Sequence, residues 1–536
     1  MSGSTSSNSQ RRSSHFLAAA VILFAVVATI LFGLLVEKEP AISDSIGYLY
    51  AGKRLASGNG LSYEDPNNAI AGPYFVPYAF QVSRKGDQLH YLGFPPGFPL
   101  LLAFGELLGL IHFVVPFLSG LTIIFTYVLG KELSGNSLTG FLAAIILVSA
   151  SAFWQFGTAA WSEVPATLAV SAGVVFYLRS HQPGYRGLAY SFLAAVILTF
   201  GHFIRYTNVV FLGALLVYEV YTVRGALLHD RRRWVFWGAA AVGVLTIPLF
   251  NHFYYGGALI TSYSSLHGWY PWSPFSLAYA LGPSFVNGFS LLESIKTLWK
   301  NFPLILLLAP GGWWLLPPRG RVLVGSIFLF GLAPYVVYAF APEGVNSRFL
   351  LPIFPFISVT VANLLANIPR WLQRPSLGWA LSLVGVMGFL YLIPGNWETL
   401  TARNNSSRGA IALAESIVAG TEPNAVFLSY TYNDMITLYH NRSVLNYRRI
   451  PASDKELERY RTEMLEPCLT GSISRLLSNN IPVYYVEDQK PSYWKSLEII
   501  QRHFILNKLD GDPAVYRITE RTGNTLLDES SCGFPD

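Results

Sequence analysis

The sequence predicts a polytopic α-helical membrane protein that ends in a small α/β domain, and the first observation behind this prediction is composition. Hydrophobic residues make up 52% of the 536 residues and charged residues only 13%, whereas soluble proteins average about 25% charged residues. The deficit is confined to residues 1–394, which hold 22 Lys and Arg and 13 Asp and Glu. Residues 395–536 hold 15 and 18, an ordinary soluble proportion. This composition excludes a cytosolic enzyme, a disordered scaffold and a basic nucleic-acid-binding protein.

Long apolar stretches are the second observation. The first stretch runs from Phe16 to Val36 and is long enough to cross a bilayer. Because the LLVEKEP that follows offers no small-residue cleavage site, we expect an uncleaved anchor rather than a signal peptide. Residues 1–15 are polar and Ser-rich, so we expect a disordered N-terminus. Further apolar stretches cover 98–112, 113–130, 138–158, 164–179, 187–203, 207–223, 234–251, 298–316, 322–340, 349–368 and 375–394.

The distribution of basic residues is the third observation, and it selects eleven spans. If every stretch except 98–112 crosses, the loops on one side hold 13 basic residues and two acids, Glu132 and Asp230, as the positive-inside rule requires. The N-terminus is then cytoplasmic, while a large first loop (37–112), a second loop (252–297) and the soluble tail lie outside. Segment 98–112 is too short to span comfortably and is expected at the outer interface. The 13 basic residues are Arg11, Arg12, Lys131, Arg179, Arg186, Arg224, Arg231, Arg232, Arg233, Arg319, Arg321, Arg370 and Arg374.

The tail, residues 395–536, alternates helical and strand patterns, which predicts a small sheet with helices on its faces. No Gly-rich phosphate loop, catalytic triad or metal-binding motif occurs in its sequence, so a structural or acceptor-docking role is the simplest expectation. Both cysteines, Cys468 and Cys532, lie here; an oxidising compartment would allow a disulfide between them, and free thiols are the alternative. The expected elements are helices at 406–419, 433–440, 470–480 and 492–501 and strands at 425–430, 482–488 and 514–519.

Four charged residues lie at the expected outer ends of different spans: Asp44, Glu163, Arg205 and Arg348. Each has an ordinary explanation, because acids are favoured at helix N-termini and arginines at span ends extend toward water. Asp44 opens an amphipathic stretch that we expect to form a helix on the membrane surface. A carboxylate can also accept the proton of an attacking hydroxyl, and arginines can hold a phosphate. The set therefore fits a lipid-phosphate substrate.

Four features in this order resemble the membrane glycosyltransferases of the GT-C superfamily. They are Asp44 just after the first span, HYLGFPPGFPLLLAFGELLG (90–109), WSEVPA (161–166) and RFLLPIFPF (348–356). The pattern is similar to the bacterial branch that includes the protein O-mannosyltransferases and the lipid A aminoarabinose transferase. The resemblance covers residues 16–394, which would form the transferase body, and leaves the tail without a relative.

The resemblance implies a GT-C fold and transfer of a hexosyl or pentosyl group from a polyprenyl-phosphate donor to an acceptor hydroxyl at the outer face, with inversion. Asp44 would be the general base, and Glu163 a second acid that orients the acceptor or assists Asp44. Arg348 would contact the donor phosphate, with Arg205 as the weaker candidate. Further candidate contacts with donor or acceptor are Lys53, Arg54, His90 and Tyr91.

No cofactor is expected. Members of the superfamily that hold a divalent cation show paired acids, D-x-D or E-x-D, whereas ISDS and WSEV each offer one. This favours a metal-independent site, although Asp44 and Glu163 could share an ion. The expected partners are the polyprenyl-phosphate sugar, a lipid, glycan or protein acceptor, and membrane lipids, but no nucleic acid. The expected location is the bacterial inner membrane.

A transporter of a lipid-linked or small solute is the main alternative. Transporters place ionisable sites near the membrane midplane and often contain internal repeats. Here the charged residues gather at the outer interface, and the second half of the sequence does not repeat the first, which favours an enzyme. A receptor or assembly protein whose tail carries the function is the third alternative.

Overall fold

The described residues of the computed structural model group into two compact units. The first comprises Met1–Lys38, Leu108–Leu249 and Ser273–Ala402, and the second comprises Glu39–Leu107, Phe250–Trp272 and Arg403–Asp536. The sequence predicts one domain boundary, between residues 394 and 395. In the structure the first loop and the tail belong to the same unit, so the units do not follow the order of the sequence. The structure describes residues 4–80, 82–83, 89–223, 230–261, 275–282, 290–302, 305–338, 340, 344–371, 375–446, 466–487, 496–509, 511 and 513–520.

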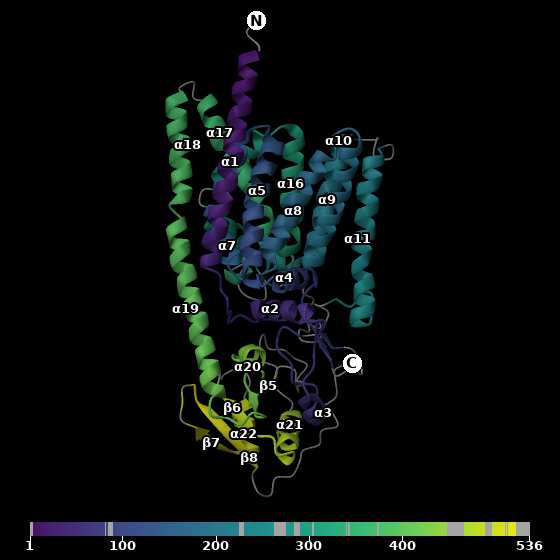
Figure 1. Ribbon diagram of the computed structural model, residues 1–536, viewed down its shortest axis with the longest axis vertical. Helices are drawn as coiled ribbons and strands as arrows, with labels where there is room; N and C mark the ends of the chain where they lie inside the picture. Colours follow the sequence, from purple (N-terminus) through teal and green to yellow (C-terminus); the bar gives the residue numbers. More distant parts are fainter. Residues whose placement is uncertain are drawn as a thin grey trace. The chain divides into compact units, whose positions relative to one another are not determined.

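The first unit is a bundle of helices. Figure 1 shows them running side by side, and α8 packs against both α5 and α9. Its α-helices are α1 (Ser4–Leu34), α5 (Val114–Ser134), α6 (Ser137–Ser149), α7 (Ser151–Gly157), α8 (Glu163–Arg179), α9 (Tyr185–Ile204), α10 (Val210–Val223), α13 (Ala278–Leu281), α14 (Ser290–Asn301), α15 (Ile305–Trp314), α16 (Pro318–Val336), α17 (Phe354–Trp371) and α18 (Pro375–Leu390). Two further helices, α11 (Arg231–Tyr255) and α19 (Ile393–Val418), begin in this unit and end in the second. In the described part of this unit, 3₁₀ segments interrupt them at η1 (Ile111–Phe113), η2 (Tyr206–Val209) and η4 (Gly344–Ile353).

Each of the eleven expected spans falls on one or two of these helices. Within the described ranges, seven helices are long and apolar enough to cross a membrane, or eight when α6 and α7, bent by 71°, count as one span. The three expected spans that miss this criterion are carried by α8, α10 and α15, with 17, 14 and 10 residues. Residues 4–15, expected to be disordered, form the start of α1 instead, because extending an existing helix costs far less than nucleating one.

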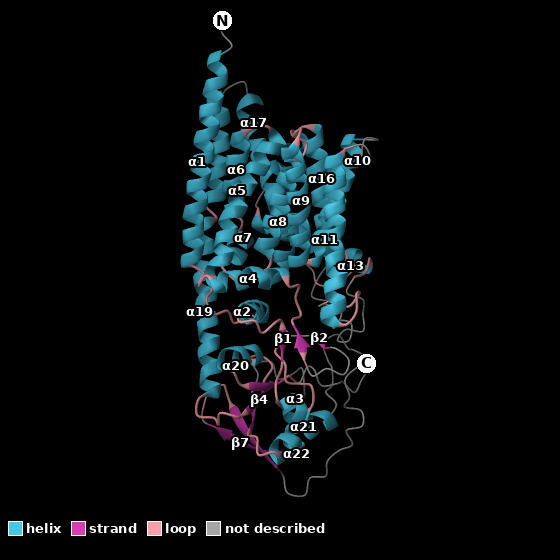
Figure 2. Ribbon diagram, turned by 45° about the vertical axis from the view of Figure 1, so that its right-hand side comes forward, coloured by secondary structure: helices cyan, strands magenta, loops and turns pink. Residues whose placement is uncertain are grey.

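The second unit holds both sheets (Figure 2). A small antiparallel sheet from the first loop has the order β1 (Ser62–Tyr63), β3 (His90–Tyr91), β2 (Val82–Ser83). The sheet of the tail has the order β5 (Ser443–Leu445), β4 (Val426–Leu428), β6 (Val483–Val486), β8 (Val515–Glu520), β7 (Phe504–Leu509). Strand β4 runs parallel to β5 and β6, and β8 is antiparallel to β6 and β7. The unit's helices include α2 (Ser43–Ala56), α3 (Asn67–Ala71), α4 (Gly97–Leu107), α20 (Asn433–His440), α21 (Glu466–Ser478) and α22 (Ser496–His503).

Helix α4 covers most of the segment expected not to cross. With 11 residues it is about 16 Å long, roughly half the hydrocarbon thickness of a bilayer. Its neighbour in the unit is α2, and the two helices approach closely at Gly52, where an added Cβ would lie 2.6 Å from the Cβ of Leu102.

The five-stranded sheet is covered on both faces, because its residues alternate between two cores as strand periodicity requires. Val426 and Leu428 pack with α21 and α22, while Phe427, between them, packs with α19 and α20. Residues of the first loop enter both cores: Phe75 lies in one and Ile46 in the other. The tail and the first loop therefore share a hydrophobic core, although Phe75 and Val426 are 351 positions apart in sequence.

One of the two cysteines is described. Cys468, on α21, is fully buried and disulfide-bonded. Cys532, the only other cysteine in the sequence, lies outside the described residues.

Candidate functional site

Glu163 is the first residue of α8 and is buried, with 1% of its surface exposed. Pro165 follows in the first turn, where its missing N–H costs nothing. Carboxylate Oε1 accepts a hydrogen bond from a guanidinium nitrogen of Arg205 and lies 3.5 Å from Nε of Arg348. Oε2 is buried and accepts no hydrogen bond from any described residue. The structure thus brings three of the four predicted charged residues into contact.

Arg205 reaches Glu163 because α9 ends there. Its backbone is extended, with φ −146° and ψ 120°, while its N–H still bonds the carbonyl of Gly201. The guanidinium also donates to Oγ of Ser162 at 3.1 Å. Two consecutive residues at the start of α8 therefore hold Arg205 in place.

Arg348 comes from η4 and is supported by aromatic rings. Its guanidinium carbon lies 4.3 Å from the ring centre of Trp161 and 5.3 Å from that of Phe349, a geometry in which the ring face attracts the cation. Phe349 also lies 5.5 Å from the guanidinium of Arg205 and stacks on Tyr335. The two arginines thus share an aromatic wall as well as one carboxylate.

Among the described residues, the cluster of Glu163, Arg205 and Arg348 joins one carboxylate to two guanidinium groups, and arginine stays protonated in proteins. Both arginine side chains are mostly buried, at 12% and 15% exposure. Buried charges of this kind cost desolvation energy and are weak contributors to stability. Fixed, oriented guanidinium groups are instead what a phosphate group requires of its site.

Asp44, Lys53 and Arg54 lie on α2, in the second unit. Asp44 is in the first turn and half-buried, whereas Lys53 and Arg54 are in the last turn. Nine residues of helix place Lys53 about 14 Å along the axis from Asp44. Lys53 is exposed, and Arg54 bonds the carbonyl of Asn59 at 2.9 Å. The structure therefore separates Asp44 from the two cations at the other end of its helix.

His90 and Tyr91 form the middle strand of the small sheet and are buried, at 2% and 6% exposure. Tyr91 packs against Tyr254 and Tyr255, with ring centres 5.0 and 6.3 Å away. Both side chains are thus buried in the second unit, where Tyr91 packs against the end of α11.

Asp434 is a buried acid that the sequence analysis does not single out. It lies in the first turn of α20, and its Oδ1 accepts the backbone N–H of Tyr78 at 2.6 Å. Burial raises the pKa of this carboxyl to about 6; the charge of Asp44 adds to the rise, and hydrogen bonds from Ser43 and Tyr78 oppose it. The available signal was an acid beside the apolar pair Met435 and Ile436 at the start of a predicted helix.

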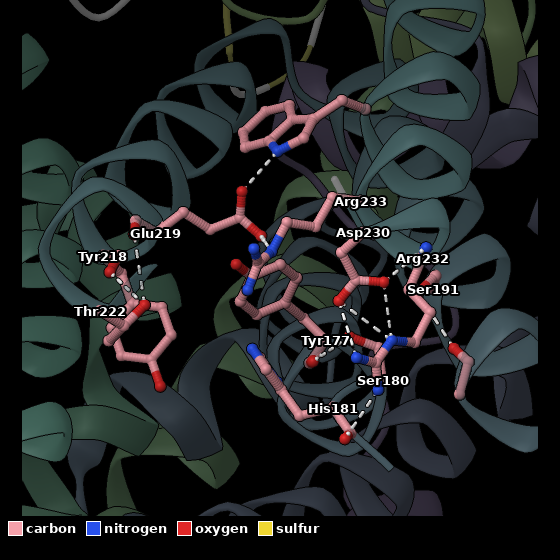
Figure 3. A network of polar contacts seen from close by, with 12 residues as sticks. Tyr177, Ser180, His181, Ser191, Tyr218, Glu219, Thr222, Asp230, Arg232 and Arg233 are labelled. Carbon is pink, nitrogen blue, oxygen red and sulfur yellow. Dashed lines mark hydrogen bonds and ion pairs between the residues drawn. The ribbon is translucent and has the colours of Figure 1, made fainter. Parts of the chain in front are cut away.

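A second polar network lies at the opposite end of α8 (Figure 3). Glu219, buried on α10, lies 3.3 Å from Nε of Arg233 and accepts a hydrogen bond from the indole of Trp237 at 2.8 Å. Arg232 bonds Asp230 through two nitrogens and lowers the pKa of that carboxyl. These contacts join α10 to α11. Both carboxylate oxygens of Glu219 have partners, unlike those of Glu163, whose Oε2 accepts no hydrogen bond from a described residue.

Metal binding receives no support from clusters of acids. Within the part of the chain that the structure describes, no three His, Cys, Asp or Glu side chains lie close enough together to hold an ion. The expectation about cofactors stays a prediction.

Comparison with known proteins confirms the fold that the sequence predicts, a bundle of apolar helices with a C-terminal sheet domain. No family model and no curated protein matches the sequence. The structure of ArnT from Cupriavidus metallidurans bound to undecaprenyl phosphate is similar over 94% of this chain and 98% of its own, with a TM-score of 0.60 and 12% sequence identity.

Two further structures agree. ArnT in the apo state matches 93% of this chain and 97% of its own, with a TM-score of 0.59 and 13% identity. Archaeal oligosaccharyltransferase AglB from Archaeoglobus fulgidus, in complex with an inhibitory peptide and a dolichol-phosphate, matches 96% of this chain and 75% of its own, with a TM-score of 0.52 and 10% identity. At these identities the likeness establishes the fold, and the protein is an integral membrane protein with the fold of ArnT and AglB.

Proposed function

We propose that this protein is a glycosyltransferase that moves a hexosyl or pentosyl group from a polyprenyl-phosphate donor to an acceptor hydroxyl, with inversion. The observation that carries the proposal is the buried Glu163 held between Arg205 and Arg348. The fold supports it, since the similar structures of ArnT and AglB contain undecaprenyl phosphate and a dolichol-phosphate.

The two arginines would bind the donor phosphate. Breaking the bond between the anomeric carbon and the phosphate oxygen leaves negative charge on the phosphate, and preorganised cations stabilise charge that develops in a transition state. Glu163 would keep both guanidinium groups aligned before the donor arrives, because its Oε1 contacts each of them. In this proposal its role is to position the arginines; the expected roles, orienting the acceptor or assisting Asp44, stay predictions.

Asp44 would act as the general base. The acceptor oxygen forms a bond to the anomeric carbon while its proton passes to the carboxylate of Asp44, and the phosphate leaves from the opposite side. A single displacement of this kind inverts the anomeric centre. The acceptor is a lipid, a glycan or a protein.

The distribution of basic residues supports a location in the bacterial inner membrane. With the N-terminus cytoplasmic, the positive-inside rule holds, and the first loop and the tail lie on the extracytoplasmic side. Transfer would therefore occur at the outer face, on the cell envelope.

Transfer from labelled polyprenyl-phosphate sugars by the purified protein tests the proposal. Arg348→Ala is expected to lower kcat about 100- to 1000-fold, as loss of a charge-stabilising group does, and Glu163→Gln to lower it by less. Arg186→Ala is the control, because Arg186 is an exposed arginine outside the cluster.

Two outcomes would contradict the proposal. One is wild-type transfer by both Arg348→Ala and Glu163→Gln. The other is uptake of a solute by proteoliposomes without any lipid-linked donor, which would favour a transporter.

A further inference from the structure

The start of α2 packs against α20, a helix of the tail. Ile46 of α2 packs in the same core as Met435 and Ile436 of α20. Just before α2, the carbonyl of Pro40 accepts a hydrogen bond from the hydroxyl of Tyr439 at 2.7 Å. The helix turn that carries Asp44 is therefore held by α20, an element of the tail.

Asp434 lies at the centre of this junction, with 4% of its surface exposed. Its Oδ1 accepts the N–H of Tyr78, and Ser43, adjacent to Asp44 in α2, hydrogen-bonds the same carboxyl group. Oδ2 is buried and has no hydrogen-bond partner among the described residues. The carboxyl group of Asp434 therefore bonds the first loop at two points, Ser43 before Asp44 in sequence and Tyr78 after it.

We propose that Asp434 is a positioning residue for Asp44, so that the tail supplies part of the catalytic machinery. This inference rests on the proposed function, in which Asp44 is the general base. When Asp434 is ionised, its carboxylate accepts the hydrogen bonds of Tyr78 and Ser43 more strongly than a neutral carboxyl group does. Asp434 also fixes the first turn of α2 through Ser43.

Protonation of Asp434 weakens these hydrogen bonds, and with them the hold on the first turn of α2 that carries Asp44. Asp44 is the charged group that acts on Asp434 from α2, and Tyr78 is the titratable residue of the loop that bonds it. On α20 itself the other titratable residues are Tyr439 and His440 at its C-terminal end. Activity is therefore expected to fall as the pH drops through about 6, where Asp434 gains its proton.

Asp434→Asn tests the inference, because asparagine keeps an oxygen that can accept from Tyr78 and loses the charge. We expect kcat to fall about 10-fold at pH 7.5, a part of the contribution of a general base, with an unchanged KM for the donor. The decline of activity below pH 6 should shift or disappear. Thr437→Val is the matched control, since Thr437 is buried one turn further along α20 and carries no charge.

A wild-type kcat and pH profile for Asp434→Asn would overturn the inference and leave the proposed function standing. If wild-type protein transfers no sugar from any donor, the proposed function fails first. Should Asp434→Asn not fold, Ser43→Ala provides the second test: it removes the hydroxyl between Asp434 and α2 and should lower kcat without changing KM. An unchanged kcat in Ser43→Ala would count against the inference.

Discussion

At the scale of single residues, two acids in this chain are buried for different reasons. Glu163 is compensated by two guanidinium groups, so its charge has partners. Asp434 has hydrogen bonds but a like charge beside it, and burial raises its pKa from 3.8 to about 6. A buried carboxylate without a cationic partner lowers the free energy of unfolding. Selection tolerates this loss of stability where the carboxylate serves the activity of the protein.

The raised pKa of Asp434 predicts how stability depends on pH. A carboxyl whose folded pKa exceeds its unfolded value contributes stability that is complete below the unfolded value of 3.8 and is lost as the pH rises through about 6. Two pKa units correspond to on the order of 3 kcal/mol. Asp434→Asn should therefore raise the apparent unfolding temperature at pH 7.5 and lose about two thirds of that advantage at pH 4.5. Thermal scans in detergent at both pH values measure this; an equal effect at the two would contradict it.

At the scale of elements, the sequence predicts helices better than short strands. Long apolar stretches locate every helix that carries an expected span, and helix 433–440 of the tail matches α20. The sequence does not predict strands β5 and β7: β5 has three residues, too few for alternation to appear, and β7 alternates buried and exposed residues only at its start.

The predicted membrane topology is enough to group Glu163, Arg205 and Arg348 at one face of the membrane. Asp434 could not be linked to Asp44, because 390 residues separate them.

The close packing of α15 on α17 leads to a prediction about thermal stability. A Cβ added at Gly312 would collide with the carbonyl oxygen of Thr360, a backbone atom, and the Gly312 carbonyl accepts a hydrogen bond from Asn363 at 3.0 Å. Small residues let membrane helices approach in this way. Gly312→Ala should lower the apparent unfolding temperature by several degrees, since the two helices must separate.

Gly388→Ala is the control for this prediction. Gly388 lies in α18, and an added Cβ there meets no atom within 4 Å. Alanine favours a helix over glycine by about 1 kcal/mol, so this variant should be unchanged or slightly more stable. Equal losses in the two variants would show that helix packing at Gly312 is not the cause.

At the scale of the whole molecule, the chain builds its second unit from segments at opposite ends of the sequence. Ala71, Tyr74 and Phe75 of the first loop enter the core on one face of the five-stranded sheet. Residues 74–76 also pair with the edge of that sheet, where the N–H of Asn446 bonds the carbonyl of Tyr74 at 2.8 Å. An unpaired edge and an open hydrophobic face are aggregation hazards, and the first loop covers both in this unit.

The tail is therefore expected not to fold alone. Residues 403–536 expressed as a separate protein would expose the faces that Ile46, Tyr74 and Phe75 cover, and burying such side chains supplies about 2 kcal/mol each. Because small domains are stable by only about 5–15 kcal/mol, the fragment should bind a hydrophobic dye and unfold without a cooperative transition. Joining residues 39–107 to it through a flexible linker should restore cooperative unfolding, measured by circular dichroism and dye binding. Cooperative unfolding of the tail without the loop would show that the two segments fold independently.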